Sequence, residues 1–68
     1  MKITKGAKLL VCSDRKGKYL AMANSDFDTD DEWFDVVLDQ EYLEDLSNFW
    51  VRGEHVSARN GIDRLEIR

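Results

Sequence analysis

The most unusual chemical feature of this sequence is a run of carboxylates without a single lysine or arginine. Segment 24–48 carries −10, whereas segment 1–23 carries +5 and segment 49–68 carries +1, which together give the net charge of −4. Carboxylates at spacings of several ångströms approach the linear charge density of a nucleic-acid backbone. We expect an acidic surface that binds a basic protein partner, made of Asp26, Asp28, Asp30, Asp31, Glu32, Asp35, Asp39, Glu41, Glu44 and Asp45.

Aromatic residues lie among these carboxylates and could anchor such a partner. Phe27 and Trp33 are the expected surface anchors, since aromatic side chains inside a charged rim are typical of protein interfaces. Phe34, Phe49 and Trp50 are expected in the core instead. A more specific form of the hypothesis is a nucleic-acid mimic, an inhibitor of phage or mobile-element origin that occupies the groove of a DNA- or RNA-binding protein. A solvated acidic loop that only aids solubility is the alternative for the same pattern.

The aspartates also have part of the spacing of a metal site. Asp26, Asp28 and Asp30 match the first three ligand positions of a calcium-binding loop. The rest of that loop is missing, because Asp31 stands where a glycine is needed and Val37 where a bidentate glutamate is needed. No cysteine and histidine set suits zinc. We therefore expect no metal site and no cofactor.

Few residues could support catalysis. The single histidine, His55, is expected opposite Glu66 as an ordinary cross-strand pair. Cys12 ends an apolar run, where a free thiol behaves as a small hydrophobic group. The carboxylates lie together in a predicted loop, whereas an acid/base pair needs one member kept dry. A chain of 68 residues also leaves little room for a deep cavity, so we expect no enzymatic activity.

A basic hairpin supports an alternative function, nucleic-acid binding. Arg15, Lys16 and Lys18 crowd a predicted hairpin tip, and Tyr19 could stack on a base, as in small barrels that bind single strands. The acidic segment would repel the same polyanion, so nucleic acid is the less favoured partner. A third alternative is an oligomeric structural component, such as a homodimer in which acidic and basic surfaces pair.

Length and composition limit the class of protein. Residues 1–68, with 35% charged side chains and no proline, fit one small domain. The apolar runs are too short to span a membrane, and the first residues lack the apolar stretch of a secretory signal. A lone cysteine agrees with a reducing compartment. We expect a cytoplasmic protein without a membrane partner.

The elements that must position these groups are short strands. Segments 9–12 and 19–23 are predicted to form a hairpin, with Gly17 supplying the positive φ of its loop. Segment 33–39 is predicted as a central strand, because Phe34, Val36 and Leu38 share one face. Segment 24–31 is predicted as a loop.

The second half of the chain is predicted to contain one helical turn and two more strands. Segment 40–48 is predicted as one or two helical turns, because Tyr42, Leu43 and Leu46 form a helical stripe. A strand follows from 49, with a bulge or tight turn around Gly53. The last hairpin turns at Asn60-Gly61, the preferred two-residue loop.

The register of that last hairpin is predicted from the turn. Pairing Arg59 with Ile62 places Val56 opposite Leu65 on the core face. Five strands and one helical turn favour a mainly β fold, a small SH3-like barrel, with an OB-like barrel as the alternative, because closing a sheet removes its exposed edges. The acidic loop, strand and helical turn are then expected to lie close together on one surface of the barrel.

Overall fold

Alternation of apolar and polar residues produces nine short strands and no helix in the computed structural model, which describes residues 1–68. A mainly β fold is therefore confirmed. Five strands form one antiparallel sheet in the order β8-β5-β3-β2-β9, and two-stranded ladders join β1 with β4 and β6 with β7. The strands are β1 Lys2–Ile3, β2 Lys8–Ser13, β3 Gly17–Ala23, β4 Phe27–Asp28, β5 Trp33–Leu38, β6 Tyr42–Glu44, β7 Phe49–Val51, β8 His55–Arg59 and β9 Asp63–Ile67.

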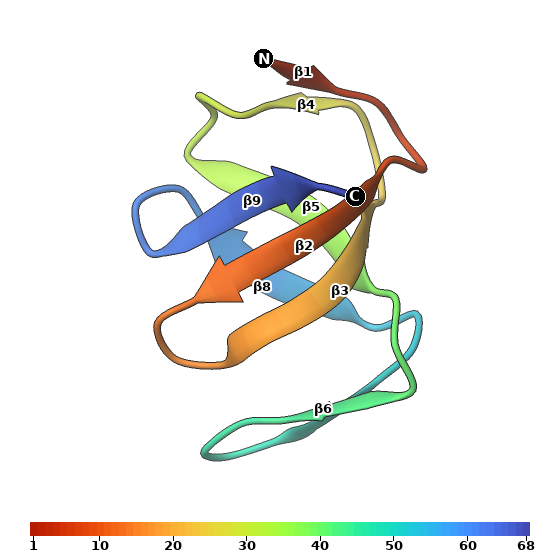
Figure 1. Ribbon diagram of the computed structural model, residues 1–68, viewed down its shortest axis with the longest axis vertical. Coiled ribbons are helices and arrows are strands. Elements are labelled where there is room, and N and C mark those ends of the chain that lie inside the picture. Colours follow the sequence, from red (N-terminus) through yellow and green to blue (C-terminus); the bar gives the residue numbers. More distant parts are fainter.

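The two ladders lie at opposite ends of the molecule, with the five-stranded sheet between them (Figure 1). β4 lies within the segment that was predicted as a loop, where Phe27 pairs with Ile3 of β1. No helix long and apolar enough to cross a membrane is present.

The hairpin predicted around Gly17 is confirmed. β2 pairs antiparallel with β3 up to Ser13 opposite Gly17, and Gly17 has a φ of +75°, which residues with a Cβ rarely adopt. The Ser13 hydroxyl accepts hydrogen bonds from the backbone N–H groups of Arg15 and Lys16, each at 3.2 Å. These bonds hold the loop in one shape, so the side chains of Arg15 and Lys16 start from a fixed backbone.

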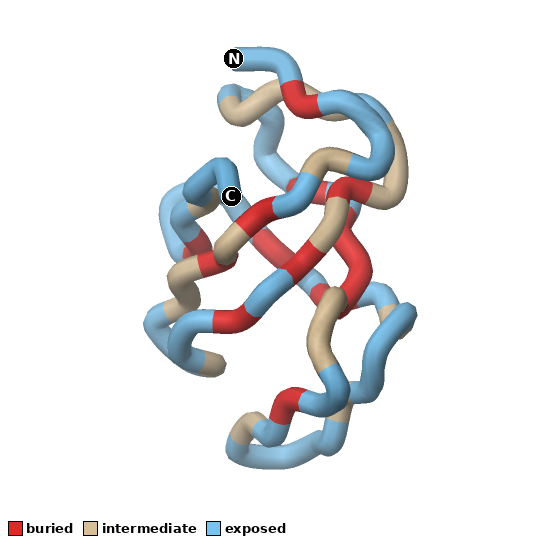
Figure 2. The backbone as a smooth tube through the Cα atoms, turned by 45° about the vertical axis from the view of Figure 1, so that its right-hand side comes forward, coloured by how far each residue is buried: buried red, intermediate tan, exposed pale blue.

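The buried face of β5 also follows the prediction. Phe34, Val36 and Leu38 are buried, and β5 is an inner strand that pairs with β3 on one side and β8 on the other. They belong to a core cluster of 12 buried residues that draws on every strand of the sheet except β9. Buried and exposed positions alternate along β8 and the first half of β5, as expected for a sheet with one face on the core (Figure 2). At the end of β5, Val36, Val37 and Leu38 are all buried.

The helical turn predicted for segment 40–48 is wrong, because β6 and β7 form a hairpin there. Leu46, which the helical stripe would place on the buried face, is 94% exposed. The Asp45 carboxylate accepts hydrogen bonds from the backbone N–H groups of Ser47 and Asn48, at 3.0 and 2.7 Å. Such local side-chain bonds favour a turn over a helix, and this one reverses the chain.

The turn at Asn60-Gly61 is present, but the hairpin predicted around it is wrong. β8 pairs with β5 and β9 pairs with β2, so these consecutive strands occupy opposite edges of the sheet. Val56 and Leu65, predicted to face each other, face β5 and β2 instead. The alternating pattern identified the buried faces, yet it did not specify the partner strand, because several strands offer a matching apolar face.

Candidate functional site

The ten carboxylates of the predicted acidic surface do not form one compact cluster. Those in segment 26–32 lie near the β1–β4 ladder, and those in segment 41–45 lie on the β6–β7 hairpin at the opposite end (Figure 1). The molecule extends 30 Å along its longest axis. The expectation that the acidic loop, strand and turn lie close together is therefore wrong, because β5 carries the chain from one end to the other.

Most of these carboxylates are engaged inside the chain. The seven that accept hydrogen bonds are Asp26, Asp28, Asp31, Glu32, Asp35, Asp39 and Asp45. In the aspartate-rich stretch, the backbone N–H of Asp30 donates to Asp28 at 3.0 Å, and this bond lowers the pKa of the Asp28 carboxyl. The spacing that matches half a calcium loop thus closes a turn. No group of three His, Cys, Asp or Glu side chains is placed to hold a metal ion.

Asp39 lies at the centre of a network of cations. Its Oδ2 lies 2.7 Å from Arg68 Nη2 and 3.4 Å from Lys8 Nζ, and its Oδ1 lies 2.9 Å from Arg52 Nη1. The hydrogen bond from Arg68 is the largest cause of a lowered pKa of the Asp39 carboxyl. Because Arg68 also donates to the carbonyls of Leu9 and Ala21, Asp39 helps to tie the end of the chain to the sheet.

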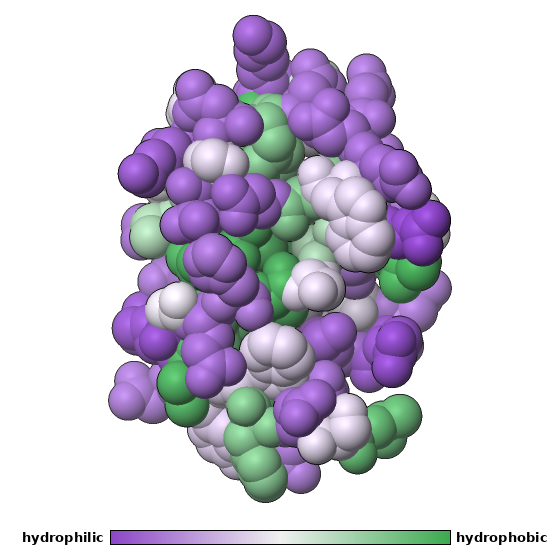
Figure 3. Space-filling model, turned by 180° about the vertical axis from the view of Figure 1, so that it is seen from behind, coloured by the Kyte–Doolittle hydropathy of each residue, from purple (hydrophilic) through white to green (hydrophobic).

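Two of the three acidic-segment carboxylates without a partner in the chain lie on the β6–β7 hairpin, and the third is Asp30. Glu41 and Glu44 accept no hydrogen bond within the chain and are exposed, and the rings of Tyr42 and Phe49 pack with their centroids 6.2 Å apart. Green apolar side chains emerge at this lower end of the molecule in the view from behind (Figure 3). We call this region the hairpin surface, and it consists of Glu41, Tyr42, Glu44, Leu46, Phe49 and Val51.

The aromatic residues follow the predictions only in part. Phe34 is buried as predicted, but Phe49 is 69% exposed, so its predicted core position is wrong. Pairing within the hairpin turns Trp50 toward the core, where it is half-buried, and so turns its neighbour Phe49 outward. Phe27, predicted as a surface anchor, is half-buried, with its ring 5.5 Å from that of Phe34. Trp33 is 56% exposed.

The residues of the predicted basic hairpin site lie in different parts of the structure. Tyr19 is 1% exposed and belongs to the core, so its predicted role in stacking on a base is wrong. Burial raises the pKa of its hydroxyl above the usual range, and the hydroxyl has no hydrogen-bond partner. Arg15 and Lys16 line a groove that also contains Trp33, whereas Lys18 lines an adjoining depression.

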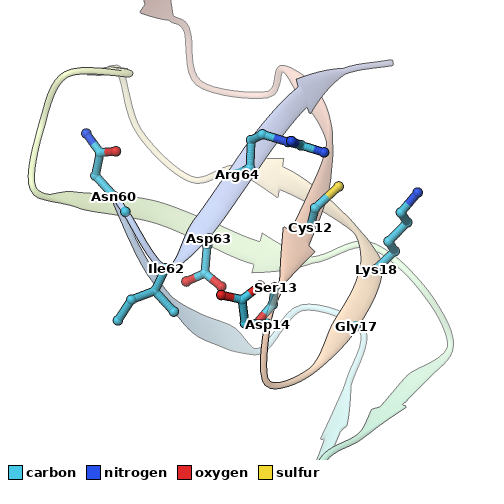
Figure 4. A pocket seen from close by; sticks show the side chains of 10 residues that line it. Cys12, Ser13, Asp14, Gly17, Lys18, Asn60, Ile62, Asp63 and Arg64 are labelled. Atoms are coloured by element: carbon cyan, nitrogen blue, oxygen red, sulfur yellow. The ribbon is translucent and has the colours of Figure 1, made fainter.

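That depression, of about 500 Å³, is the largest on the molecule and lies between the β2–β3 loop and the β8–β9 turn. The Asp63 carboxylate points toward Ser13 and Asp14 in its middle, and Lys18 and Arg64 extend on the outside of β3 and β9 (Figure 4). Its charges are mixed in sign, and it is open to solvent. Of its two carboxylates, Asp14 is exposed, whereas Asp63 is buried and accepts a hydrogen bond from the backbone N–H of Arg59 at 2.8 Å.

The two residues considered for catalysis lie on different strands. Cys12 on β2 is half-buried, and its thiol lies 3.1 Å from a carboxylate oxygen of Glu66. His55, predicted to face Glu66, lies opposite Val37 instead, because β8 and β9 do not pair. Its Nε2 lies 3.4 Å from the side-chain nitrogen of Asn24.

Comparison with known protein families, curated proteins and solved structures finds no match to this chain. The chemistry of the surface is therefore what indicates a function. Two regions combine exposed aromatic rings with charged side chains: the hairpin surface, with apolar rings beside unpaired carboxylates, and the groove that contains Arg15, Lys16 and Trp33. The sequence pattern could not have located the first, because it predicted a helix there.

Proposed function

We propose that this protein is a non-catalytic protein-binding module whose hairpin surface docks on a basic partner. The observation that carries the proposal is the exposure of Tyr42 and Phe49, side by side, on a hairpin that projects from the sheet. Exposed apolar patches of this kind typically mark interaction sites, and aromatic side chains dominate the binding energy of such sites.

The charge around these rings indicates the chemistry of the partner. Glu41 and Glu44 have no cation to pair with inside the chain, so complementary lysines or arginines would come from outside. The net charge of −4 would also attract a basic protein over distance and raise its association rate at low salt. Most other carboxylates of the acidic segment accept hydrogen bonds inside the chain. Their negative charge still contributes to this long-range attraction.

A nucleic-acid mimic is a more specific form of this proposal. Its support is that the acidic segment runs between the two ends of a molecule 30 Å long, so that it could follow a nucleic-acid groove. Against it stands Asp39, whose charge is opposed by three neighbouring cations. The hairpin surface needs no continuous row of charges, so we base the proposal on the hairpin.

The proposal includes a finer description of the fold, a small SH3-like barrel. Its support is the order of the five strands, in which the two edge strands β8 and β9 follow each other in the chain through one short turn. A bridge between Asn60 and Asp63 brings these edges together at that turn. The helical turn expected of either barrel is absent, so the strand order alone supports the SH3-like description over the OB-like alternative. The proposed location is the cytoplasm, where the free Cys12 would stay reduced.

The test is a comparison of variants immobilised through the N-terminus, which lies at the end opposite the hairpin (Figure 1). Proteins from a native host lysate are captured at low salt by the wild type, by Phe49→Ser, by Glu41→Gln/Glu44→Gln and by Asp30→Asn. Asp30→Asn is the matched control, because Asp30 also accepts no hydrogen bond but lies away from the hairpin. A captured protein is then purified and titrated against each variant at rising salt.

We expect one basic protein to bind the wild type and Asp30→Asn equally, and to bind Phe49→Ser about tenfold more weakly or worse. The paired glutamate variant should weaken binding and reduce its salt dependence. Equal binding by Phe49→Ser would refute the proposal. If sedimentation shows instead that the wild type dimerises and Phe49→Ser does not, the partner is a second copy of the chain, and the oligomer alternative replaces the proposed one.

A further inference from the structure

A second surface lies beside the β6–β7 hairpin and gathers three cations around an exposed tryptophan. A groove of about 230 Å³ runs between the β2–β3 loop and the adjacent ends of β5 and β8. Arg15 and Lys16 line it from the loop, and Trp33 and Arg59 line it from the two strands. We call it the Trp33 groove, with Ser13, Arg15, Lys16, Trp33, Ser57 and Arg59 as its main lining residues.

Strand pairing and contacts with aromatic rings position two cations of this groove. Trp33 and Arg59 are direct partners across the β5–β8 ladder, and the Arg59 guanidinium lies 5.3 Å from the centre of the Trp33 ring. On the other side, Lys16 Nζ lies 6.0 Å from the ring of Trp50. Contacts between cations and aromatic rings restrict long side chains, so less entropy is lost when a ligand binds them.

The negative charges near the groove are weak competitors. Asp63 lines it, but its carboxylate is buried and accepts a hydrogen bond from the backbone N–H of Arg59 at 2.8 Å. Glu32 pairs with Arg59 at 3.2 Å, and both side chains are largely exposed, so this pair is easily exchanged for another anion. Asp45 on the neighbouring β6–β7 turn lies beside Arg15 and Lys16, and its carboxylate accepts hydrogen bonds inside the chain. The three cations therefore face three carboxylates, each already engaged inside the chain.

The exposed ring supplies what a simple anion site lacks. Trp33 is 56% exposed although Arg59 lies over its ring. It does not belong to the core cluster or to the side chains packed against that cluster. An aromatic face beside cations suits a ligand that alternates flat rings with anions, since bases stack on the ring and phosphates contact the cations. The hydroxyls of Ser13 and Ser57 add hydrogen-bonding groups along the groove.

We infer that the Trp33 groove binds single-stranded nucleic acid, with one base stacked on Trp33 and neighbouring phosphates held by Arg15, Lys16 and Arg59. A single strand fits better than a duplex, because only its unpaired bases can reach a ring at the side of a groove. This site uses different side chains from the hairpin surface, although Arg15 lies beside Leu46 at the β6–β7 turn. It also replaces the sequence-based hypothesis of a basic hairpin with Tyr19, whose ring is buried.

The test is fluorescence anisotropy with labelled oligothymidylate and oligouridylate of about eight nucleotides, a typical site size for small barrels. Binding is measured at low and rising salt for the wild type, Trp33→Ala, Trp33→Phe, Arg15→Gln, Lys18→Gln and Phe49→Ser. Lys18→Gln is the matched control, because Lys18 is on the same hairpin but lines the other depression. Thermal unfolding confirms that each variant is folded.

We expect Trp33→Ala to weaken binding about fivefold or more, and Trp33→Phe to restore part of the loss, as base stacking predicts. Arg15→Gln should weaken binding and make the slope of log K against log salt less negative by about 0.7, the contribution of one phosphate contact on a single strand. Lys18→Gln and Phe49→Ser should bind as the wild type does.

Three results would overturn the inference. The first is the absence of an anisotropy change at low salt. The second is equal weakening by Lys18→Gln and Arg15→Gln, which would show attraction without a site. The third is equal affinity for thymidine monophosphate, since a strand adds phosphate contacts that a mononucleotide lacks. None of these results bears on the hairpin surface, so the two proposals fail or stand separately.

Discussion

Replacing Asp39 by asparagine tests whether the Asp39 carboxylate stabilises the fold or only adds negative charge to the surface. In Asp39→Asn, the side chain keeps its shape but loses the charge that faces Arg68, Arg52 and Lys8. The Asp39 side chain is 15% exposed, so solvent replaces it poorly as a partner for these cations. We expect Asp39→Asn to lower the free energy of unfolding clearly.

The size of this loss follows from the three contacts. The bond to Arg68 is short, at 2.7 Å, and partly buried on both sides, and a net contribution of about 1.5–3 kcal/mol is usual for a hydrogen bond to a charged group. Arg52 and Lys8 are 58% and 60% exposed, so each pair adds about 0.2–1 kcal/mol. Asparagine still accepts one weaker bond, which leaves a loss of about 2 kcal/mol. For a domain of this size, that lowers Tm by about 8–16 °C.

The assay is thermal and urea unfolding of the wild type, Asp39→Asn and Asp30→Asn at neutral pH. Asp30→Asn removes the same charge from a carboxylate with no partner, so its free energy of unfolding should stay within about 0.5 kcal/mol of the wild type. Equal stabilities of the two variants would refute the interpretation of the network. A double variant with Arg68→Gln should show coupling between the two positions, because each single change already breaks the same bond.

The pH dependence gives a second test of Asp39. Its pKa is lowered in the folded state, so its contribution is complete above the unfolded pKa and is lost as pH falls through the lowered folded value. The difference in stability between the wild type and Asp39→Asn should therefore shrink on acidification. A difference that stays constant down to strongly acidic pH would contradict the assignment.

Three further predictions concern single groups. Asp45→Asn should loosen the β6–β7 turn and red-shift the emission of Trp50, whose indole N–H donates to Asp45 at 3.1 Å. The hydrogen bond from the backbone N–H of Ser47 lowers the pKa of the Asp45 carboxyl. The emission of Trp50 in the wild type should therefore shift to the red only as pH falls through that lowered pKa, and an emission spectrum that does not change with pH would contradict this. Tyr19→Phe removes a buried hydroxyl without a partner, so the free energy of unfolding should stay equal or rise by up to about 1 kcal/mol, and a clear loss in urea unfolding would show an overlooked partner. Gly61→Ala should cost about 1 kcal/mol in the same assay, since Gly61 has a φ of +96° and nothing lies where its Cβ would be; unchanged stability would mean that the turn relaxes.

Sequence reasoning succeeded where the determinants are local. The β2–β3 hairpin follows from an apolar run, a polar turn and Gly17, all within about fifteen residues. The buried face of β5 follows from the apolar residues Phe34, Val36 and Leu38 at every second position, although Val37 on the other face is buried too. These features depend on backbone geometry and side-chain alternation, which a short stretch of sequence specifies by itself.

It failed where two local signals competed. Segment 40–48 carries a helical stripe, but Asp45 also carries the turn signal of an Asx side chain, and the turn prevailed. A nine-residue helix would gain little by itself, because short helices are marginal without burial of one face. The resulting hairpin moved Phe49 and Tyr42 to the outside and so created the hairpin surface, which the sequence-based hypothesis had placed around Phe27 and Trp33 instead.

By itself, the sequence determined the distribution of charge, the faces that are buried and the positions of the tight turns, because each of these properties depends on residues close together in the chain. Only the tertiary structure decided which strands pair across the sheet and therefore which distant groups meet. Asp39 meets Arg68 and Trp33 meets Arg59 because β9 joins β2 while β8 joins β5. Every strand edge offers the same backbone N–H and carbonyl groups, so the choice of partner rests on how all the apolar faces fit into one core.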